Sequence, residues 1–100
     1  MLVEFRSKKL EKCYREAKAA SRAFGDVIGK KYIQRINIIK QTRNLDELQS
    51  LPGLRCHPLS GDRKGQYAVN LNGFYRLIFS LKDDVLEIVL IEEVSKHYGD

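Results

Sequence analysis

The residues best suited to chemistry lie in one segment, between Leu54 and Phe79. This segment holds the histidine His57. It also holds four cations and two tyrosines: Arg55, Arg63, Lys64, Arg76, Tyr67 and Tyr75. A site for RNA needs cations for the phosphates, flat rings for the bases and, for cleavage, a group that moves protons near neutral pH. The segment supplies all three kinds of group, so it is the first candidate for a site that binds or cuts RNA.

Cleavage of an RNA strand without a metal ion requires two proton transfers. A base takes the proton of the 2′-hydroxyl group, an acid protonates the leaving 5′-oxygen, and cations stabilise the charged phosphorane. Histidine suits both transfers because its unperturbed pKa is about 6.5. The chain has two histidines, His57 and His97, which only the fold can bring together. The plain alternative for each is a surface histidine with no catalytic part.

Arg76 stands between Tyr75 and Leu77 in an apolar strand, where an unpaired charge is costly. Two interpretations are open. Its guanidinium can form an ion pair with a carboxylate on the neighbouring strand, or it can point at the scissile phosphate, to which its planar fork can donate two hydrogen bonds. Arg63 and Lys64 lie in a loop bounded by glycines, which indicates either an ordinary solvated loop or a phosphate contact.

The beginning of the chain predicts a strand and a helix. Leu2 to Phe5 predicts a short strand, and Ser7 can cap the helix that follows. Gly25 and Gly29 interrupt or end this helix. Its apolar residues recur at helical spacing: Leu10, Cys13, Tyr14 and Ala17.

A second helix is predicted from about Asp26 or Lys30 to Arg43, with Arg35 and Lys40 on its solvent side. One face of this helix is apolar and carries Ile28, Tyr32, Ile36 and Ile39. Because this face is continuous over three turns, we expect it to pack on the strands that follow.

The second half of the chain predicts strands. Asn44 and Glu47 resemble a capping box for a short helical turn through Leu48, which Pro52-Gly53 ends. From Leu54 the apolar period is about two, and three strands are expected at Tyr67–Leu71, Phe74–Leu81 and Val85–Val94, joined by a hairpin at Asn72-Gly73 and a turn at Lys82-Asp83-Asp84. Helices followed by strands predict one α+β domain over residues 1–100, with the helices on one face of a mostly antiparallel sheet.

Charge and composition limit the functions open to the chain. The net charge is +5, and residues 1–43 carry 12 Lys/Arg against 4 Asp/Glu. This basic region indicates either attraction to nucleic acid or an ordinary solvated helix surface. No apolar run approaches the roughly 18 residues of a membrane span, and no signal peptide begins the chain, so we expect a cytoplasmic protein with no membrane contact. Cys13 and Cys56 are expected to be free thiols, and Cys56 should point away from His57 because adjacent strand residues face opposite sides.

A longer pattern runs through the same segment. It reads His57-Pro58-Leu59-x-Gly61-Asp62-Arg63-x-Gly65, then Tyr67-x-Val69, then Tyr75-Arg76-Leu77-Ile78-Phe79. The pattern resembles the HigB branch of the RelE-like toxins, the killer proteins of bacterial type II toxin–antitoxin pairs. The resemblance implies a RelE-like fold with two N-terminal helices packed on a mostly antiparallel sheet of four to five strands. It also implies a ribosome-dependent endoribonuclease that enters the ribosomal A site, cleaves mRNA without a metal ion or other cofactor, and halts translation.

The resemblance also assigns roles to residues. It implies a catalytic role for His57 and Arg76, with the residues after the last strand, His97 and Tyr98, completing the site. The residues expected to bind RNA or phosphate are Arg55, Arg63, Lys64 and Lys96. The implied partner is a HigA-like helix-turn-helix antitoxin that neutralises the toxin and represses their operon, so operator DNA would be contacted only through the antitoxin.

The chain departs from the family pattern in two places. HigB-like toxins often have lysine three residues after the histidine, and here that residue is Ser60, so Lys64 could supply the charge. Many relatives end in Asp-Tyr-His, whereas His97 precedes Tyr98 here. Because a shift of one residue changes the face of a strand, either side chain can be the one that faces the site.

Two other functions remain open at this point. The first is a module on the same fold that binds RNA or protein without catalysis, which Ser60 and the altered C-terminus would suit. The second is a metabolic enzyme, for which the chain offers no cofactor motif. A catalyst would leave cut mRNA, whereas a binding module would leave it intact.

Overall fold

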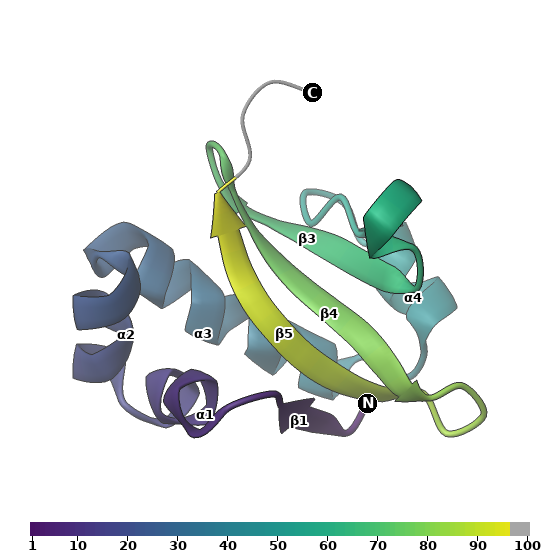
Figure 1. Cartoon of the computed structure of the whole chain (residues 1–100), viewed down its shortest axis with the longest axis horizontal. Helices are drawn as coiled ribbons and strands as arrows, with labels where there is room; N and C mark the ends of the chain where they lie inside the picture. Colours follow the sequence, from purple (N-terminus) through teal and green to yellow (C-terminus); the bar gives the residue numbers. More distant parts are fainter. Residues whose placement is uncertain (97–100) are drawn as a thin grey trace.

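The computed structural model describes residues 1–96, which form helices on one side of a five-stranded sheet (Figure 1). The elements in chain order are β1 (Val3–Phe5), α1 (Lys8–Arg15), α2 (Ala17–Phe24), α3 (Asp26–Gln41), α4 (Leu45–Ser50), β2 (His57–Pro58), the 3₁₀ turn η1 (Gly61–Arg63), β3 (Gln66–Asn72), β4 (Tyr75–Asp83) and β5 (Ile88–Lys96). The strand order is β1-β5-β4-β3-β2, and only the β1–β5 pair is parallel. The predicted α+β class and mostly antiparallel sheet are confirmed.

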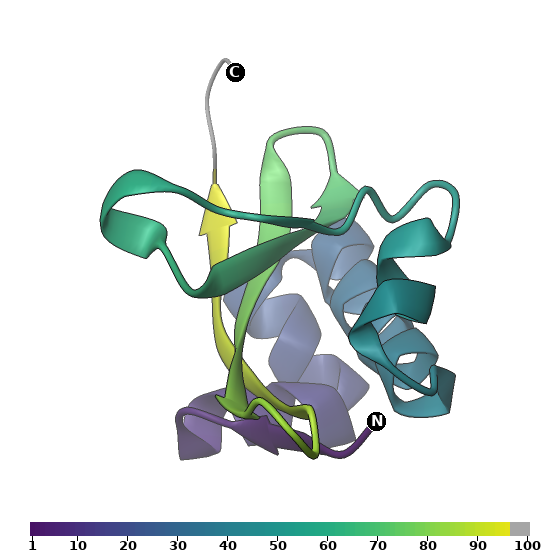
Figure 2. The ribbon, with the colours of Figure 1, turned by 90° about the vertical axis from the view of Figure 1, so that its right-hand side faces the viewer.

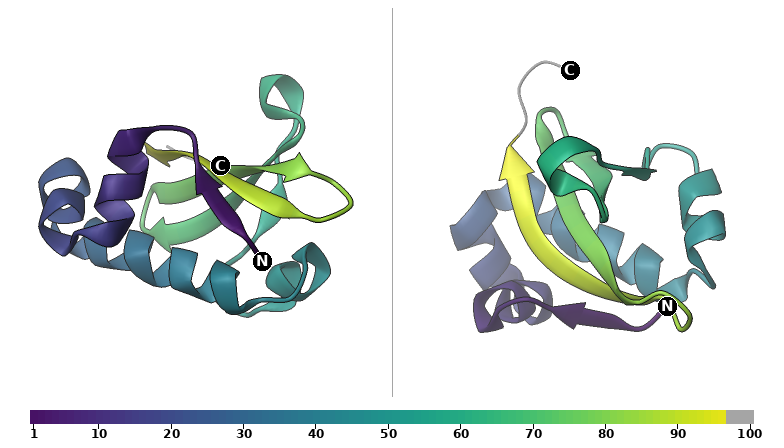
Figure 3. Two further views of the ribbon diagram at one scale, coloured as in Figure 1. Left: turned by 90° about the horizontal axis from the view of Figure 1, so that it is seen from below. Right: turned by 45° about the vertical axis from the view of Figure 1, so that its right-hand side comes forward.

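The core lies between α3 and the sheet, and it follows from two periodicities. Tyr32, Ile36 and Ile39 recur every three or four residues on α3 and are fully buried. Alternate residues of the central strands point toward them and are also buried: Val69 and Leu71 on β3, Leu77 and Phe79 on β4, and Val89 and Ile91 on β5. Figures 2 and 3 show α3 and the turn η1 on opposite sides of the sheet. One face is therefore covered by helices and the other is left for the loop that contains η1.

The N-terminal helical region differs from the prediction in one detail, because the first predicted helix is two short helices. The helix is interrupted at Glu16, which has an extended backbone with φ −127° and ψ 113°. The break lets α2 turn back and run beside α3. Gly29 makes this close approach possible, since a Cβ atom there would lie 2.9 Å from the backbone carbon of Ala20. The predicted cap at Ser7 is confirmed, with its Oγ accepting from the backbone N–H of Leu10 at 3.1 Å.

The last turn also differs from the prediction. β4 continues through Asp83, and β5 begins only at Ile88, so Val85 and Leu86 are exposed turn residues rather than strand residues. The reason is local: Oδ1 of Asp83 accepts from the backbone N–H groups of Val85 and Leu86 at 2.9 and 2.8 Å. Asp side chains commonly stabilise turns in this way.

The expectation that Arg35 faces solvent was wrong. Its side chain is half-buried, and its Nε donates a hydrogen bond to the backbone carbonyl of Asn70 at 2.9 Å. This bond ties α3 to β3. Lys40 on the same helix is exposed, as expected.

Candidate nucleic-acid site on the open sheet face

The candidate residues gather on the face of the sheet that the helices leave uncovered, which we call the open face. Because Leu77 and Phe79 point to the helices, their neighbours on β4 point the other way. The open face carries Gln66, Ala68 and Asn70 from β3, Arg76, Ile78 and Ser80 from β4, Glu93 and Ser95 from β5, and His57 from β2. Two rows of cross-strand neighbours result: His57–Ala68–Ile78–Glu93 and Asn70–Arg76–Ser95.

His57 stands at the edge of this face, on the two-residue strand β2. Its side chain is exposed, and its Nδ1 lies 2.7 Å from the backbone carbonyl oxygen of Arg55. A carbonyl can only accept, so in the neutral ring Nδ1 carries the hydrogen and Nε2 has the free lone pair. The ring is thus oriented with its basic nitrogen away from the backbone.

Cys56 lies on the opposite side of the chain from His57, as the sequence indicated. It is buried in the core, and burial raises the pKa of its thiol to about 12. Cys13 is buried as well, and neither cysteine is in a disulfide. A Cys–His catalytic pair is therefore not formed at this site.

Arg76 is the second residue of β4, the central strand of the sheet. Its Nε is buried and has no hydrogen-bond partner. Within residues 1–96 Arg76 makes no ion pair, because the carboxylate of Glu93 in the neighbouring row is engaged by Arg63 instead. The ion-pair interpretation of Arg76 thus finds no support among the described residues. A cation held without a partner beside an open face is suited to receive an anion.

The loop before β3 folds over the open face. Ala68 and Ile78 are buried although they point away from the helices and lie outside the main core cluster, and Figure 1 shows the loop with η1 in front of the sheet. Arg63 fixes the loop, since it donates to Oε1 of Glu93 at 2.6 Å and to Oε1 of Gln66 at 2.9 Å. Lys64 next to it is exposed.

The structure brings some of the predicted residues together and separates others. His57 and Arg76 are two strands and one row apart, which places their Cα atoms about 12 Å from each other by ordinary sheet spacings. Two long polar side chains at this separation leave room for a phosphodiester between them. Lys96 is on the other face, where its Nζ lies 5.6 Å from the ring centroid of Tyr75. His97 and Tyr98 lie outside the described residues.

Sequence reasoning missed the polar residues of β5. A register shift between Ile78 and Phe79 bulges the β5 strand and leaves both Glu92 and Glu93 with partners on the open face. Glu92 accepts from Ser80 at 2.6 Å and from Arg6 at 2.9 Å, and the hydrogen bond from Arg6 is the main reason that the pKa of this carboxyl is lowered. Simple alternation along β5 could not have found the pair, because the bulge breaks it.

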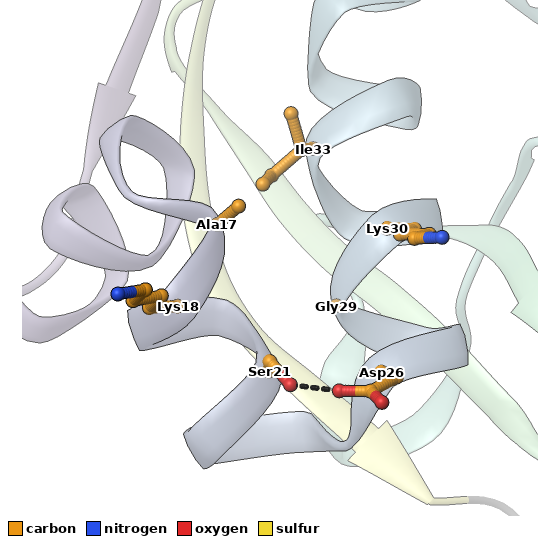
Figure 4. A pocket seen from close by; sticks show the side chains of 7 residues that line it. All are labelled: Ala17, Lys18, Ser21, Asp26, Gly29, Lys30 and Ile33. Carbon is orange, nitrogen blue, oxygen red and sulfur yellow. Dashed lines mark hydrogen bonds between the residues drawn. The ribbon is translucent and has the colours of Figure 1, made fainter.

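Two pockets lined in part by basic residues lie on the helical side of the molecule, away from the open face. One lies between α2 and α3 and is lined by Lys18, Lys30, Ala17, Gly29, Ile33 and the hydrogen-bonded pair Ser21–Asp26 (Figure 4). The other is lined by Lys9, Lys12 and Arg22, next to Cys13. Among residues 1–96 no cluster of His, Cys, Asp and Glu could hold a metal ion, and each helix is too short or too polar to span a bilayer.

Comparison with known proteins places the chain among bacterial toxins. A family model described as the RelE-like toxin of the type II toxin–antitoxin system HigB matches residues 3–92. Toxin HigB-1 of Vibrio cholerae serotype O1 is 32% identical over 85 residues, which cover 85% of this chain and 88% of that protein.

Solved structures of other toxins share the fold. The YoeB/ParE toxin from Agrobacterium tumefaciens has a TM-score of 0.64 at 13% identity and covers 98% of this chain and 100% of its own. The YoeB–YefM complex from Staphylococcus aureus has a TM-score of 0.60 at 20% identity, with 98% and 99% covered. The DinJ–YafQ complex from E. coli has a TM-score of 0.54 at 23% identity, with 97% of each chain covered.

Proposed function

The chain belongs to the HigB-like family of RelE-like toxins from type II toxin–antitoxin systems, and from this membership we propose that it is an endoribonuclease that cuts mRNA in the ribosomal A site. Such cleavage truncates the message on the translating ribosome and stops protein synthesis. The place of action would be the cytoplasm, where ribosomes and mRNA are found. Membership in the family supports the role as a toxin, and the residues of the open face support RNA cleavage as its activity.

One observation carries this proposal: the open face holds an oriented imidazole and an arginine whose buried Nε has no hydrogen-bond partner among residues 1–96. His57 has its Nε2 free because Nδ1 donates to the carbonyl of Arg55. Arg76 has a buried Nε with no partner, which in a central strand is an unfavourable state unless an anion completes it. A phosphodiester supplies both needs, because its 2′-hydroxyl neighbour has a proton to give and its oxygens can accept from Arg76.

In the proposed reaction the 2′-oxygen attacks the adjacent phosphorus while Nε2 of His57 takes the 2′-hydroxyl proton. The bond from phosphorus to the 5′-oxygen breaks, which leaves a 2′,3′-cyclic phosphate on one fragment and a 5′-hydroxyl on the other. Arg76 donates to the phosphoryl oxygens, on which negative charge grows in the transition state. No metal ion is needed for these steps, since the proton acceptor and the cation both come from the protein.

The second proton transfer, to the leaving 5′-oxygen, is assigned to the residues after β5. His97 would give a bell-shaped dependence of the rate on pH together with His57. Tyr98 would instead stack on a base or orient the 2′-hydroxyl group. The strand β5 leads directly to these residues from Lys96, at the end of the sheet where Arg76 pairs with Ser95.

The remaining cations are proposed to hold the RNA backbone. Arg63 is already at the open face and could exchange the carboxylate of Glu93 for a phosphate. Arg55 and Lys64 are both exposed, and Lys64, which follows Arg63, could replace the charge of the family lysine at Ser60. Lys96 lies on the other face, so its contact with RNA would be at the end of β5.

The proposed protein partner is a HigA-like helix-turn-helix antitoxin. Two of the similar structures are complexes, YoeB with YefM and DinJ with YafQ, and DinJ–YafQ is named a toxin–antitoxin complex in a second structure. By analogy the antitoxin of this chain would neutralise it and repress their shared operon. The toxin would then reach operator DNA only through the antitoxin.

Expression in bacteria tests the proposal. Expression of the chain alone should arrest growth, and co-expression of its antitoxin should restore it. His57→Gln and Arg76→Ala should each remove toxicity while the protein stays folded and soluble. Lys30→Ala, at an exposed residue of α3, is the matched control and should remain toxic. Normal growth with soluble wild-type protein present would overturn the proposed activity.

A further inference from the structure

The backbone of Arg55 has a conformation that its residue type does not favour. Its φ is +52°, and only Glu87 shares a positive φ among the non-glycine residues described. Left-handed backbone is uncommon for residues with a Cβ atom. The side chain of Arg55 does not explain the conformation, because it is exposed and makes no hydrogen bond or ion pair within residues 1–96. The cause must lie in what the backbone itself achieves.

The pairing with β3 shows what the conformation achieves. His57 pairs with Ala68, and the carbonyl of Leu54 accepts from the N–H of Asn70 at 2.8 Å. From Ala68 to Asn70 is two residues, whereas from His57 back to Leu54 is three. One extra residue is therefore inserted opposite β3, as in a β-bulge, and in the G1 type of bulge one residue adopts a left-handed backbone. Arg55, with its positive φ, is this extra residue.

The bulge also turns the carbonyl of Arg55 onto the imidazole of His57, at 2.7 Å from Nδ1. We propose that Arg55 is a positioning residue whose left-handed backbone holds His57 in the tautomer with hydrogen on Nδ1 and the lone pair on Nε2. Free histidine in water favours the other neutral tautomer, so the contact reverses the ordinary preference. This inference rests on the proposed function only for its consequence, which is that the reacting nitrogen is Nε2.

Backbone and side chain can be separated at this residue by substitution. Glycine adopts a positive φ without strain, so Arg55→Gly keeps the bulge and removes only the side chain. Valine is β-branched and strongly disfavours a positive φ, so Arg55→Val removes the bulge geometry as well. Arg55→Ala lies between these two and serves if Arg55→Val does not fold. The open-face groups around His57, namely Arg63, Arg76 and Glu93, are unchanged in all three variants.

The test is ¹⁵N NMR of the histidine side chains, at an alkaline pH above which the ¹⁵N shifts no longer change. His97→Gln in every sample leaves the signals of His57 alone. Wild type and Arg55→Gly should show hydrogen on Nδ1. Arg55→Val, or Arg55→Ala, should shift the tautomer ratio by roughly fivefold, the equivalent of one ordinary hydrogen bond. Hydrogen on Nε2 in the wild type, or an unchanged ratio in both Arg55→Val and Arg55→Ala, would overturn the inference.

Cleavage of ribosome-bound mRNA supplies the second measurement, with His97 intact. Arg55→Val should cleave roughly fivefold more slowly at saturation than Arg55→Gly, because both variants lack the guanidinium and only the backbone conformation differs between them. The NMR result does not depend on activity. A protein with the expected tautomer and no cleavage would therefore retain the inference and refute the proposed function.

Discussion

Replacing Arg76 by methionine should make the protein more stable and inactive at the same time. Arg76 has a buried Nε with no partner in the absence of RNA. Methionine keeps an unbranched apolar stem of similar length and removes the buried polar atoms. The substitution thus retains most of the packing and deletes the unsatisfied donor.

The magnitude follows from the state of that one atom. A buried donor left without a partner costs about 1–3 kcal/mol of stability, so removing it should raise the free energy of unfolding. Imperfect packing of the new methionine side chain offsets part of this gain. A net gain of about 1 kcal/mol raises the melting temperature of a domain of this size by about 4–8 °C. Loss of a cation that stabilises the transition state should lower the cleavage rate about 10²–10³-fold.

Arg35→Met is the matched control, because Arg35 is also a half-buried arginine next to Asn70 but has a partner. Its Nε donates to the Asn70 carbonyl at 2.9 Å, so removing it should lower stability by about 1 kcal/mol. Thermal unfolding followed by circular dichroism measures both variants, and primer extension on ribosome-bound mRNA measures cleavage. A fall in melting temperature for Arg76→Met as large as that for Arg35→Met would refute the reasoning, because Arg76 would then be a structural residue.

Three further predictions concern the scaffold. Gly29→Ala should destabilise the protein by about 1–3 kcal/mol in urea unfolding, because the new Cβ would lie 2.9 Å from the backbone of Ala20, whereas Lys30→Ala on the exposed side of the same helix should change little. Burial raises the pKa of Cys56 to about 12, so a thiol reagent near neutral pH should label this cysteine only in denaturant, and fast labelling of the native protein would contradict its placement in the core. The pKa of Glu92 is lowered from its ordinary value of 4.5, mainly by the hydrogen bond from Arg6. The contribution of Glu92 to stability is therefore present above its pKa in the unfolded chain and is lost as the pH falls through its pKa in the folded protein. Glu92→Gln should make the free energy of unfolding depend less on pH in the acid range, and an unchanged pH dependence would show that the contact does not contribute to stability.

Much of the fold could be read from apolar periodicity. The stripe from Tyr32 to Ile39 and the alternation from Val69 to Phe79 predicted both the helix and the strands that it covers, and these residues are buried as expected. A hairpin forms between β3 and β4 as predicted, but its turn residues are Gly73 and Phe74, and Asn72 is the last residue of β3. Such patterns are reliable because burial of a whole face outweighs any single residue's preference.

The errors arose where one polar contact decides the backbone. Asp83 accepts hydrogen bonds from the backbone N–H groups of Val85 and Leu86 and so holds these two residues in a turn, although their apolar side chains favour a strand. Arg35 is half-buried instead of fully exposed because its Nε donates to the backbone carbonyl of Asn70 on β3. Contacts of this kind join residues far apart in sequence, and no local pattern encodes them.

The candidate site was predictable in composition but not in arrangement. His57, Arg63 and Arg76 were singled out from residue type and family resemblance, and all three reach the open face. The pairing of Arg63 with Glu93 could not be foreseen, because the bulge in β5 changes which side chains face this side. The contact between Arg55 and His57 could not be foreseen either, because it depends on a second irregularity, the extra residue opposite β3.

Cleavage of a defined mRNA on purified ribosomes tests the central claim most directly. Under single-turnover conditions the wild-type protein should cut the message in the A site and leave a 2′,3′-cyclic phosphate end, and His57→Gln should slow the cut about 10²–10⁴-fold. The double variant His57→Gln with Arg76→Ala should be little slower than the slower single variant, because the two residues act on one phosphodiester. Intact mRNA with the wild-type protein bound to the ribosome, or full cleavage by folded His57→Gln, would contradict the account.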